Sequence, residues 1–265
     1  MLIDFHTHCF PDKLFERAVA TLQEKSGNIM TYSDGSLAGL RKTMKETGVD
    51  VSVVLNIATN ERQMKSVNDF ASSINNEKDI FAFGSVFPFA PDVMDELERI
   101  KDLGLKGVKF HPEYQGFEAD DPRVFPVYKK VSALGLISVF HAGVDYGFSP
   151  PYKAMPKAMA KAASVFDSPV IAAHWGGVNA GDGVIEYLCG ENLYFDLSFG
   201  YCMMPKHYAQ KIAEKHTPDK LLFGTDCPWH RADLEMRLIT SLGLSDEEMD
   251  KITYKNAQKL LGICK

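Results

Sequence analysis

The sequence predicts an α/β fold, a single (β/α)8 or TIM barrel formed by residues 1–265. Short apolar runs alternate with longer amphipathic stretches along the whole chain, as expected for repeated strand–helix units. The apolar runs are rich in Val, Ile, Leu and Phe and lack regular polar alternation, which is typical of parallel strands covered on both faces. A length of 265 residues also fits one such barrel.

Eight apolar runs are predicted to be strands. The turn after the first run has the sequence His6-Thr7-His8, so it lacks the glycine-rich turn of a doubly wound open sheet, which is the competing architecture. We therefore favour the barrel. The predicted strands are Leu2–His6, Val51–Ile57, Phe81–Val86, Gly107–Phe110, Leu136–Phe140, Val170–Ala173, Leu193–Leu197 and Leu221–Gly224.

The segments between the strands carry helical patterns. Leu37, Leu40 and Met44 share one face of the helix predicted over Ser36–Thr47. The segment before it, Asn28–Ser36, is expected to form a flexible loop between the first two helices, near the barrel mouth. The other predicted helices are Glu61–Asn75, Pro91–Leu103, Asp121–Gly135, Pro151–Phe166, Val178–Leu188, Pro205–Lys215 and a capped tail helix over Ser245–Gly262.

Composition and charge exclude several classes of protein. Apolar residues make up 45% of the chain and charged residues 24%, which is ordinary for a globular domain. The net charge is -6 without runs of Lys or Arg, so we expect neither nucleic acid nor a membrane as a partner. The five cysteines form no CxxC pair, and the chain starts without a secretory signal pattern, so we expect a cytoplasmic protein. The sequence leaves a homodimer open.

Histidines gather where barrel enzymes carry out their chemistry. Five of the eight histidines lie at or just beyond the carboxyl end of a predicted strand, and Asp226 follows the last strand. In a (β/α)8 barrel these strand ends converge on one mouth, which holds the active site. The five are His6, His8, His111, His141 and His174.

Four of these side chains form a candidate metal site. His6 and His8 are two residues apart on a strand, so their imidazoles point to the same side. With His141 and the carboxylate of Asp226, they would surround one divalent ion with three nitrogens and one oxygen. Zinc suits such a donor set best, while Mn, Fe, Co and Ni stay open. The residues alone do not separate the role of His174 from that of His141.

Six motifs follow one another along the chain: IDFHTH (3–8), GVKFHP (107–112), HAG (141–143), AHWGG (173–177), FGTDCP (223–228) and NAQKLLG (256–262). In this order the motifs resemble the amidohydrolase superfamily. They are most similar to its amidohydrolase-related branch, which contains aminocarboxymuconate-semialdehyde decarboxylase and several lactonases and other hydrolases. The resemblance covers the whole chain, and the combination is more specific than any single motif.

The resemblance implies that His6, His8, His141 and Asp226 bind the metal and that His174 stands beside it as a catalytic or water-orienting imidazole. In hydrolases of this kind, a water activated by the metal attacks the substrate, and Asp226 or His174 would carry its proton to the leaving group. In the decarboxylases, a substrate carboxylate approaches the metal, and protonated Asp226 or His174 would deliver a proton to carbon.

Three further residues are candidate substrate contacts. Lys109 and His111 are two residues apart, so both are expected to face the mouth. Lys109 would hold a substrate carboxylate; the alternatives are carboxylation to bridge two metals, or pairing with an internal acid. His111 would hydrogen-bond the substrate or support a neighbouring group, and Trp175 would form a pocket wall or pack in the core. Asp4 lies two residues before His6, so we expect it to point inward one layer deeper. It would be a structural acid, or alternatively support a metal ligand.

Taken with the resemblance, these residues predict a metal-dependent hydrolase that cleaves a lactone, an amide or a C–C bond in a small, carboxylated substrate. A non-oxidative, metal-dependent decarboxylase is the alternative; the resembling decarboxylases tend to be longer, which favours hydrolysis slightly. A TatD-type nuclease is less well supported, because such enzymes carry a glutamate ligand after strand four, where this chain has Lys109. A metal-storing or structural barrel would not need Lys109, His111 and His174 in one mouth.

Overall fold

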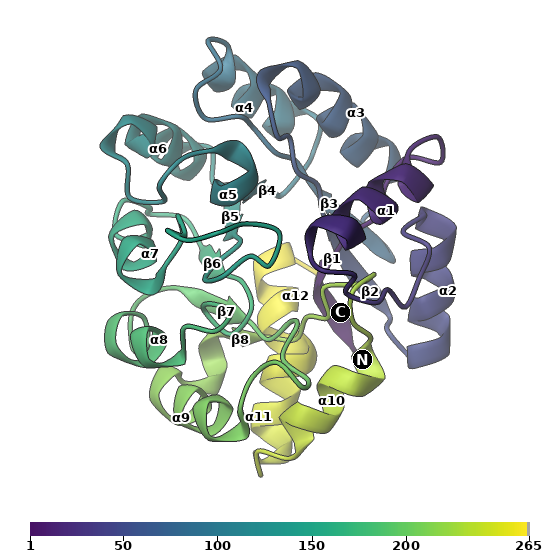
Figure 1. Cartoon of the computed structure of the whole chain (residues 1–265), viewed down its shortest axis with the longest axis vertical. Coiled ribbons are helices and arrows are strands. Elements are labelled where there is room, and N and C mark those ends of the chain that lie inside the picture. Colours follow the sequence, from purple (N-terminus) through teal and green to yellow (C-terminus); the bar gives the residue numbers. More distant parts are fainter. Residues whose placement is uncertain (264–265) are drawn as a thin grey trace.

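A computed structural model describes residues 1–263, and its centre is a ring of parallel strands surrounded by helices (Figure 1). Strands β1 to β3 form one sheet and β4 to β8 a second. Gly84 N–H, after β3, donates to the Gly107 carbonyl of β4 at 2.9 Å, and Phe5 N–H of β1 donates to the Phe223 carbonyl after β8 at 2.9 Å. These hydrogen bonds join the two sheets at both edges. The predicted barrel is therefore confirmed. The strands are β1 (Ile3–Thr7), β2 (Val51–Leu55), β3 (Ile80–Phe83), β4 (Gly107–Phe110), β5 (Ile137–Phe140), β6 (Val170–Ala172), β7 (Tyr194–Asp196) and β8 (Leu221–Leu222).

The helices form the outer layer of the barrel (Figure 1). Between residues 1 and 263, none has the length and apolar character needed to cross a membrane. The helices are α1 (Phe15–Lys25), α2 (Leu37–Thr47), α3 (Met64–Ile74), α4 (Val93–Asp102), α5 (Pro112–Gln115), α6 (Phe125–Ala133), α7 (Pro156–Ala163), α8 (Gly181–Tyr187), α9 (Lys206–His216), α10 (Ala232–Thr240), α11 (Asp246–Asp250) and α12 (Asn256–Leu261).

Local chemistry explains most differences from the predicted helices. Helix α7 starts at Pro156 instead of Pro151, because Met155 before this proline is held in an extended conformation. The short α5 and the whole of α10 were missed. The tail starts with the predicted capping box at Ser245, but a π-helical turn over Lys251–Lys255 separates α11 from α12.

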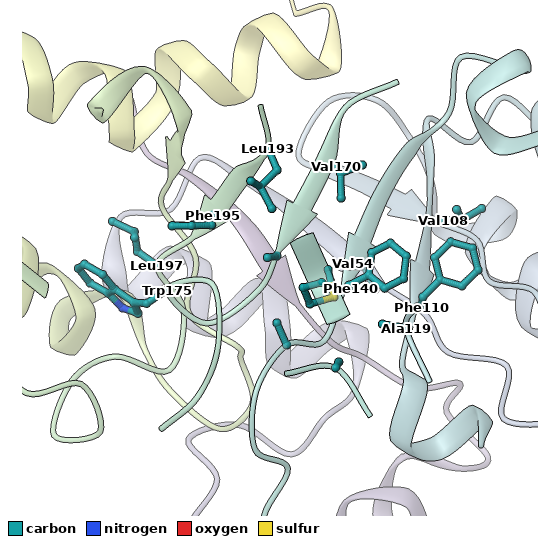
Figure 2. Close-up of a cluster of buried hydrophobic side chains, with 14 of the residues drawn as sticks. Val54, Val108, Phe110, Ala119, Phe140, Val170, Trp175, Leu193, Phe195 and Leu197 are labelled. Atoms are coloured by element: carbon teal, nitrogen blue, oxygen red, sulfur yellow. The ribbon is translucent and has the colours of Figure 1, made fainter. Parts of the chain in front are cut away.

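Two buried clusters of apolar side chains stabilise the barrel. One fills the inside of the ring, where Phe5, Val53 and Phe83 belong to the same cluster. The other lies between the strands and the helices, and Figure 2 shows part of it, with Phe110 and Phe140 side by side. Both clusters leave the carboxyl ends of the strands free for polar residues, and this is where the candidate site lies.

Candidate active site at the barrel mouth

The carboxyl ends of the strands surround an open cleft. Every residue predicted to bind the metal or to act in catalysis lines it, together with Lys109 and His111. The polar residues among its lining include His6, His8, Lys109, His111, His141, His174 and Asp226, and the apolar ones include Leu22, Ile29, Val144, Val178, Phe199 and Trp229.

A β-bulge in β1 sets the direction of the two neighbouring histidines. In the pairing of β1 with β2, Asp4 lies opposite Ser52 and Thr7 lies opposite Val54. Three residues along β1 therefore match only two along β2. The extra residue breaks the strict alternation of side chains along the strand. His6 and His8 line the cleft beyond this bulge, as predicted.

The same bulge makes the expected direction of Asp4 wrong. Asp4 lies on the outer side of β1, beside Leu40 and Met44 of α2. Its carboxylate accepts hydrogen bonds from Thr225 Oγ1 at 2.6 Å and Thr225 N at 2.9 Å. Burial raises the pKa of Asp4 to about 8, against the effect of these bonds. Asp4 therefore ties β1 to the loop after β8, which agrees with the expected structural role.

The hydrogen bonds of His6 and His8 leave one bare nitrogen on each ring. His8 Nδ1 lies 2.8 Å from the carbonyl oxygen of Leu55, which can only accept, so Nδ1 carries the proton. His6 Nδ1 likewise lies 2.8 Å from Asp196 Oδ2. In the neutral form of each ring, Nε2 then carries no proton, and the two Nε2 atoms face each other at 3.2 Å.

Asp226 brings a carboxylate oxygen to these two nitrogens. Its Oδ1 lies 3.3 Å from His6 Nε2 and 3.1 Å from His8 Nε2. The backbone of Asp226 has a φ of 68°, and its N–H donates to the His6 carbonyl at 2.8 Å, which holds this left-handed turn against β1. Burial raises the pKa of Asp226, while His8 and Lys109 oppose that shift. Three acceptor atoms thus converge, and a cation stabilises such a group.

His141 and His174 form a second pair of imidazoles in the cleft. His174 Nε2 lies 3.2 Å from His141 Nδ1, and His174 Nδ1 lies 2.8 Å from Ser198 Oγ. Among the described residues, His141 Nε2 is buried without a hydrogen-bond partner. A buried free nitrogen fits the predicted role of His141 as a metal ligand, although it lies outside the tight group of His6, His8 and Asp226.

His111 and Asp145 face His141 at the same cleft. The His111 and His141 rings are stacked, with centroids 4.2 Å apart and planes at 9°. Parallel rings at this separation cannot both direct an in-plane lone pair at one ion, because zinc–nitrogen bonds are only about 2 Å long. His111 Nε2 instead lies 3.3 Å from Asp145 Oδ2, and burial raises the pKa of Asp145 to about 6.

Lys109 lies among these groups, as its spacing predicted. The side chain is almost fully buried, and its Nζ is 3.4 Å from His6 Nε2. Burial lowers the pKa of Lys109 to about 8, and the nearby carboxylates of Asp196 and Asp226 limit that shift. A cation in this position is suited to an anionic substrate group.

The imidazoles themselves are suited to metal binding. Burial lowers the pKa of His6 and His174 well below the ordinary value, and lowers that of His141 to about 3. Neutral imidazoles keep the lone pairs that a metal requires. The donor set and the unpaired nitrogens therefore fit a divalent ion held by His6, His8 and Asp226, with His141 in the same cleft.

Two residues that orient this group were not predicted from the sequence. Asp196 is fully buried at the end of β7, and besides His6 it accepts the N–H of His174 at 3.1 Å and that of Ser198 at 3.2 Å. Ser198 Oγ also lies 3.2 Å from His6 Nδ1. An acid in an otherwise apolar predicted strand, at its carboxyl end, is the signal that could have identified Asp196.

Trp175 does not line the cleft. Its side chain is only 1% exposed and lies in the outer cluster, where Figure 2 shows it beside Phe195 and Leu197. His174 and Trp175 both have positive φ values, 59° and 61°, and the chain therefore leaves the regular strand alternation at this point. The expectation that Trp175 contacts the substrate is corrected to its alternative, packing in the core.

A barrel with imidazoles, carboxylates and a buried lysine at the mouth defines a class of protein, the metal-dependent barrel enzymes. The chain belongs to the amidohydrolase family, whose model matches residues 3–263. This confirms the resemblance found in the motifs. A comparison with curated proteins finds no match.

Solved structures share the fold at low sequence identity. A TIM-barrel protein from Bordetella bronchiseptica has a TM-score of 0.78 at 20% identity, covering 98% of both chains. A 2,6-dihydroxybenzoate decarboxylase from Rhizobium has a TM-score of 0.72 at 16% identity, covering 99% of this chain and 98% of that one. A dihydroxybenzoic acid decarboxylase from Polaromonas with bound manganese and 2-nitroresorcinol has a TM-score of 0.71 at 16% identity, covering 99% and 97%.

Proposed function

We propose that this chain is a metal-dependent decarboxylase that releases CO2 from a small carboxylated molecule without an external oxidant. The observation that carries the proposal is the buried Lys109 ammonium, 3.4 Å from His6 Nε2 and beside the candidate metal ligands. The cleft walls include apolar residues such as Val178 and Phe199. A substrate carboxylate would thus move from water into a site where a positively charged group is already in position.

The residues of the cleft would have three roles in this reaction: metal binding, substrate binding and proton delivery. His6, His8 and Asp226, with His141, would hold a divalent metal, and that ion supplies positive charge for orienting the substrate. Lys109 would bind the substrate carboxylate. The bond between that carboxylate and carbon breaks, the electron pair stays on carbon, and the carbon takes a proton. Asp226 or His174 would deliver this proton.

The structural neighbours support this proposal over hydrolysis. Two of the solved structures compared above are described as decarboxylases, although at 16% identity they share only the fold. Chain length favours hydrolysis slightly, but the aligned region covers 98% of the Rhizobium decarboxylase.

Hydrolysis remains the second candidate because of one observation. Asp226 Oδ1 lies within 3.3 Å of both Nε2 atoms, where it could accept a proton from an attacking water. The same cleft would then bind a carboxylated lactone or amide. A nuclease activity has less support, since Lys109 occupies the strand-four position.

A single panel of substrates separates the two reactions. The metal-free protein is loaded with Zn²⁺ or Mn²⁺ and incubated with aromatic carboxylic acids, lactones and amides, and both CO2 release and ring opening or amide cleavage are recorded. CO2 release that disappears in Lys109→Met supports decarboxylation. Ring opening or amide cleavage without CO2 supports hydrolysis. A requirement for bicarbonate together with two metals per chain would instead indicate a carboxylated Lys109.

A further inference from the structure

Phe199 forms part of the cleft wall from the loop that follows β7. Its backbone has a φ of 56°, a left-handed conformation that bulky residues rarely adopt. The ring centroid lies 6.2 Å from that of His174 and 6.3 Å from that of Tyr146. Strained backbone persists only where the surrounding contacts fix it, so something must hold this loop.

The contacts that fix the loop come from Glu235 on α10. This carboxylate is fully buried, and it accepts hydrogen bonds from Gly200 N at 3.0 and 3.2 Å and from Tyr201 N at 3.0 Å. His230 Nδ1 is its remaining partner. We use the name Glu235 clasp for Glu235, His230 and the N–H groups of Gly200 and Tyr201.

His230 joins the clasp to Phe199 and to a third loop. Its ring centroid lies 4.9 Å from that of Phe199 and 6.2 Å from that of Tyr32, which lies between α1 and α2. The N–H of Tyr32 donates to the Pro228 carbonyl at 2.7 Å. The clasp therefore connects the loops that follow β1, β7 and β8 around the ring of Phe199.

Ordinary helix packing does not explain a buried acid at this position. Leu238 and Ile239 already bury the apolar face of α10. Burial raises the pKa of Glu235, and the bonds from His230, Tyr201 and Gly200 act in the opposite direction. A buried carboxylate is unfavourable unless its oxygens are hydrogen-bonded, and here the partners belong to loops at the cleft.

We propose that Glu235 is a positioning residue, which holds Phe199 through the clasp as a wall of the cleft beside His174. Phe199 then determines how tightly a flat, apolar part of the substrate is bound. The inference rests on the proposed function in one respect, namely that a small substrate binds in this cleft.

Four variants test the clasp. Glu235→Ala removes its acceptor oxygens, and Phe199→Ala removes the wall itself. Glu235→Gln keeps one oxygen for the two N–H groups and offers an amide N–H to His230, so it should rescue the position of the loop. His216→Ala is the matched control, because His216 is also buried and also bridges two backbone groups, but near the start of β7.

Two readouts are expected to change together. Amide hydrogen exchange at Gly200 and Tyr201 should accelerate at least about tenfold in Glu235→Ala and stay near wild type in Glu235→Gln and in the control. Glu235→Ala and Phe199→Ala should each raise KM about fivefold to tenfold, with a smaller change in kcat, as expected for a lost aromatic contact. The double variant should raise KM no further, because both changes remove the same wall.

Unchanged amide exchange in Glu235→Ala, or KM effects that multiply in the double variant, would overturn the proposal. If Glu235→Ala does not fold, Glu235→Asp, one methylene shorter, replaces it. If the wild type turns over no member of the panel, the proposed function has failed. The clasp is then tested by crystal structures of Glu235→Ala and Glu235→Gln. Phe199 displaced in Glu235→Ala but not in Glu235→Gln supports it, and Phe199 in place in both variants contradicts it.

Discussion

Asp196→Asn is expected to weaken metal binding by reversing the tautomer of His6. Asp196 Oδ1 accepts the N–H groups of His174 at 3.1 Å and Ser198 at 3.2 Å, so the oxygen of an asparagine must stay on that side. Its NH2 group would then take the place of Oδ2, 2.8 Å from His6 Nδ1. Facing a donor, Nδ1 becomes an acceptor, and the ring proton moves to Nε2, the nitrogen predicted to bind the metal.

Loss of such an orienting partner typically weakens metal affinity about 10- to 100-fold, or about 1.4–2.8 kcal/mol. The assay is competition between the metal-free protein and a chelator for Zn²⁺ at pH 7. Asp4→Asn is the matched control, since Asp4 is a buried acid that faces away from the cleft. A Zn²⁺ affinity of Asp196→Asn within about threefold of wild type would refute the tautomer argument.

Three other outcomes are expected. The double variant His6→Ala, His8→Ala should lose its metal by elemental analysis while keeping its circular dichroism spectrum. His174→Asn should keep the metal and lose rate, while Asp226→Asn should lose about 10²–10⁴ in single-turnover rate, more than its metal loss explains. Burial lowers the pKa of His216 from 6.5 to about 4, so stability present above pH 6.5 is lost as pH falls toward 4. In urea unfolding, the loss of stability between pH 6.5 and pH 4 should be smaller in His216→Ala than in wild type, by up to about 3 kcal/mol.

The predictable part of the site follows from regular geometry. Parallel strands end at one mouth, so the positions of His6, His141, His174 and Asp226 relative to the predicted strands were enough to bring them into one cleft. Strand boundaries shifted by at most three residues without moving these side chains elsewhere.

The unpredicted part lies where the backbone departs from that geometry. A bulge in β1 turns Asp4 outward, and two consecutive left-handed residues turn Trp175 into the core. Neither feature has a signal in the side-chain pattern. The clasp around Glu235 was also missed, because α10 was not predicted and two of the three partners of Glu235 are backbone N–H groups, which carry no sequence signature.

The charges in the cleft favour an anionic substrate over a neutral one. In the group nearest His6, the imidazoles count as neutral, Lys109 as an ammonium, and Asp196 and Asp226 as carboxylates, which sums to one negative charge. A divalent ion would leave the group with a net positive charge, and a carboxylate would neutralise it where water is scarce. Benzoate and benzamide have nearly the same shape, so this pair isolates the effect of charge. In titration calorimetry of the zinc-loaded protein at pH 7, benzoate should bind at least about tenfold more tightly, and the difference should shrink in Lys109→Met. Equal binding of the two would mean that charge does not select the substrate, and the main support for decarboxylation would be lost.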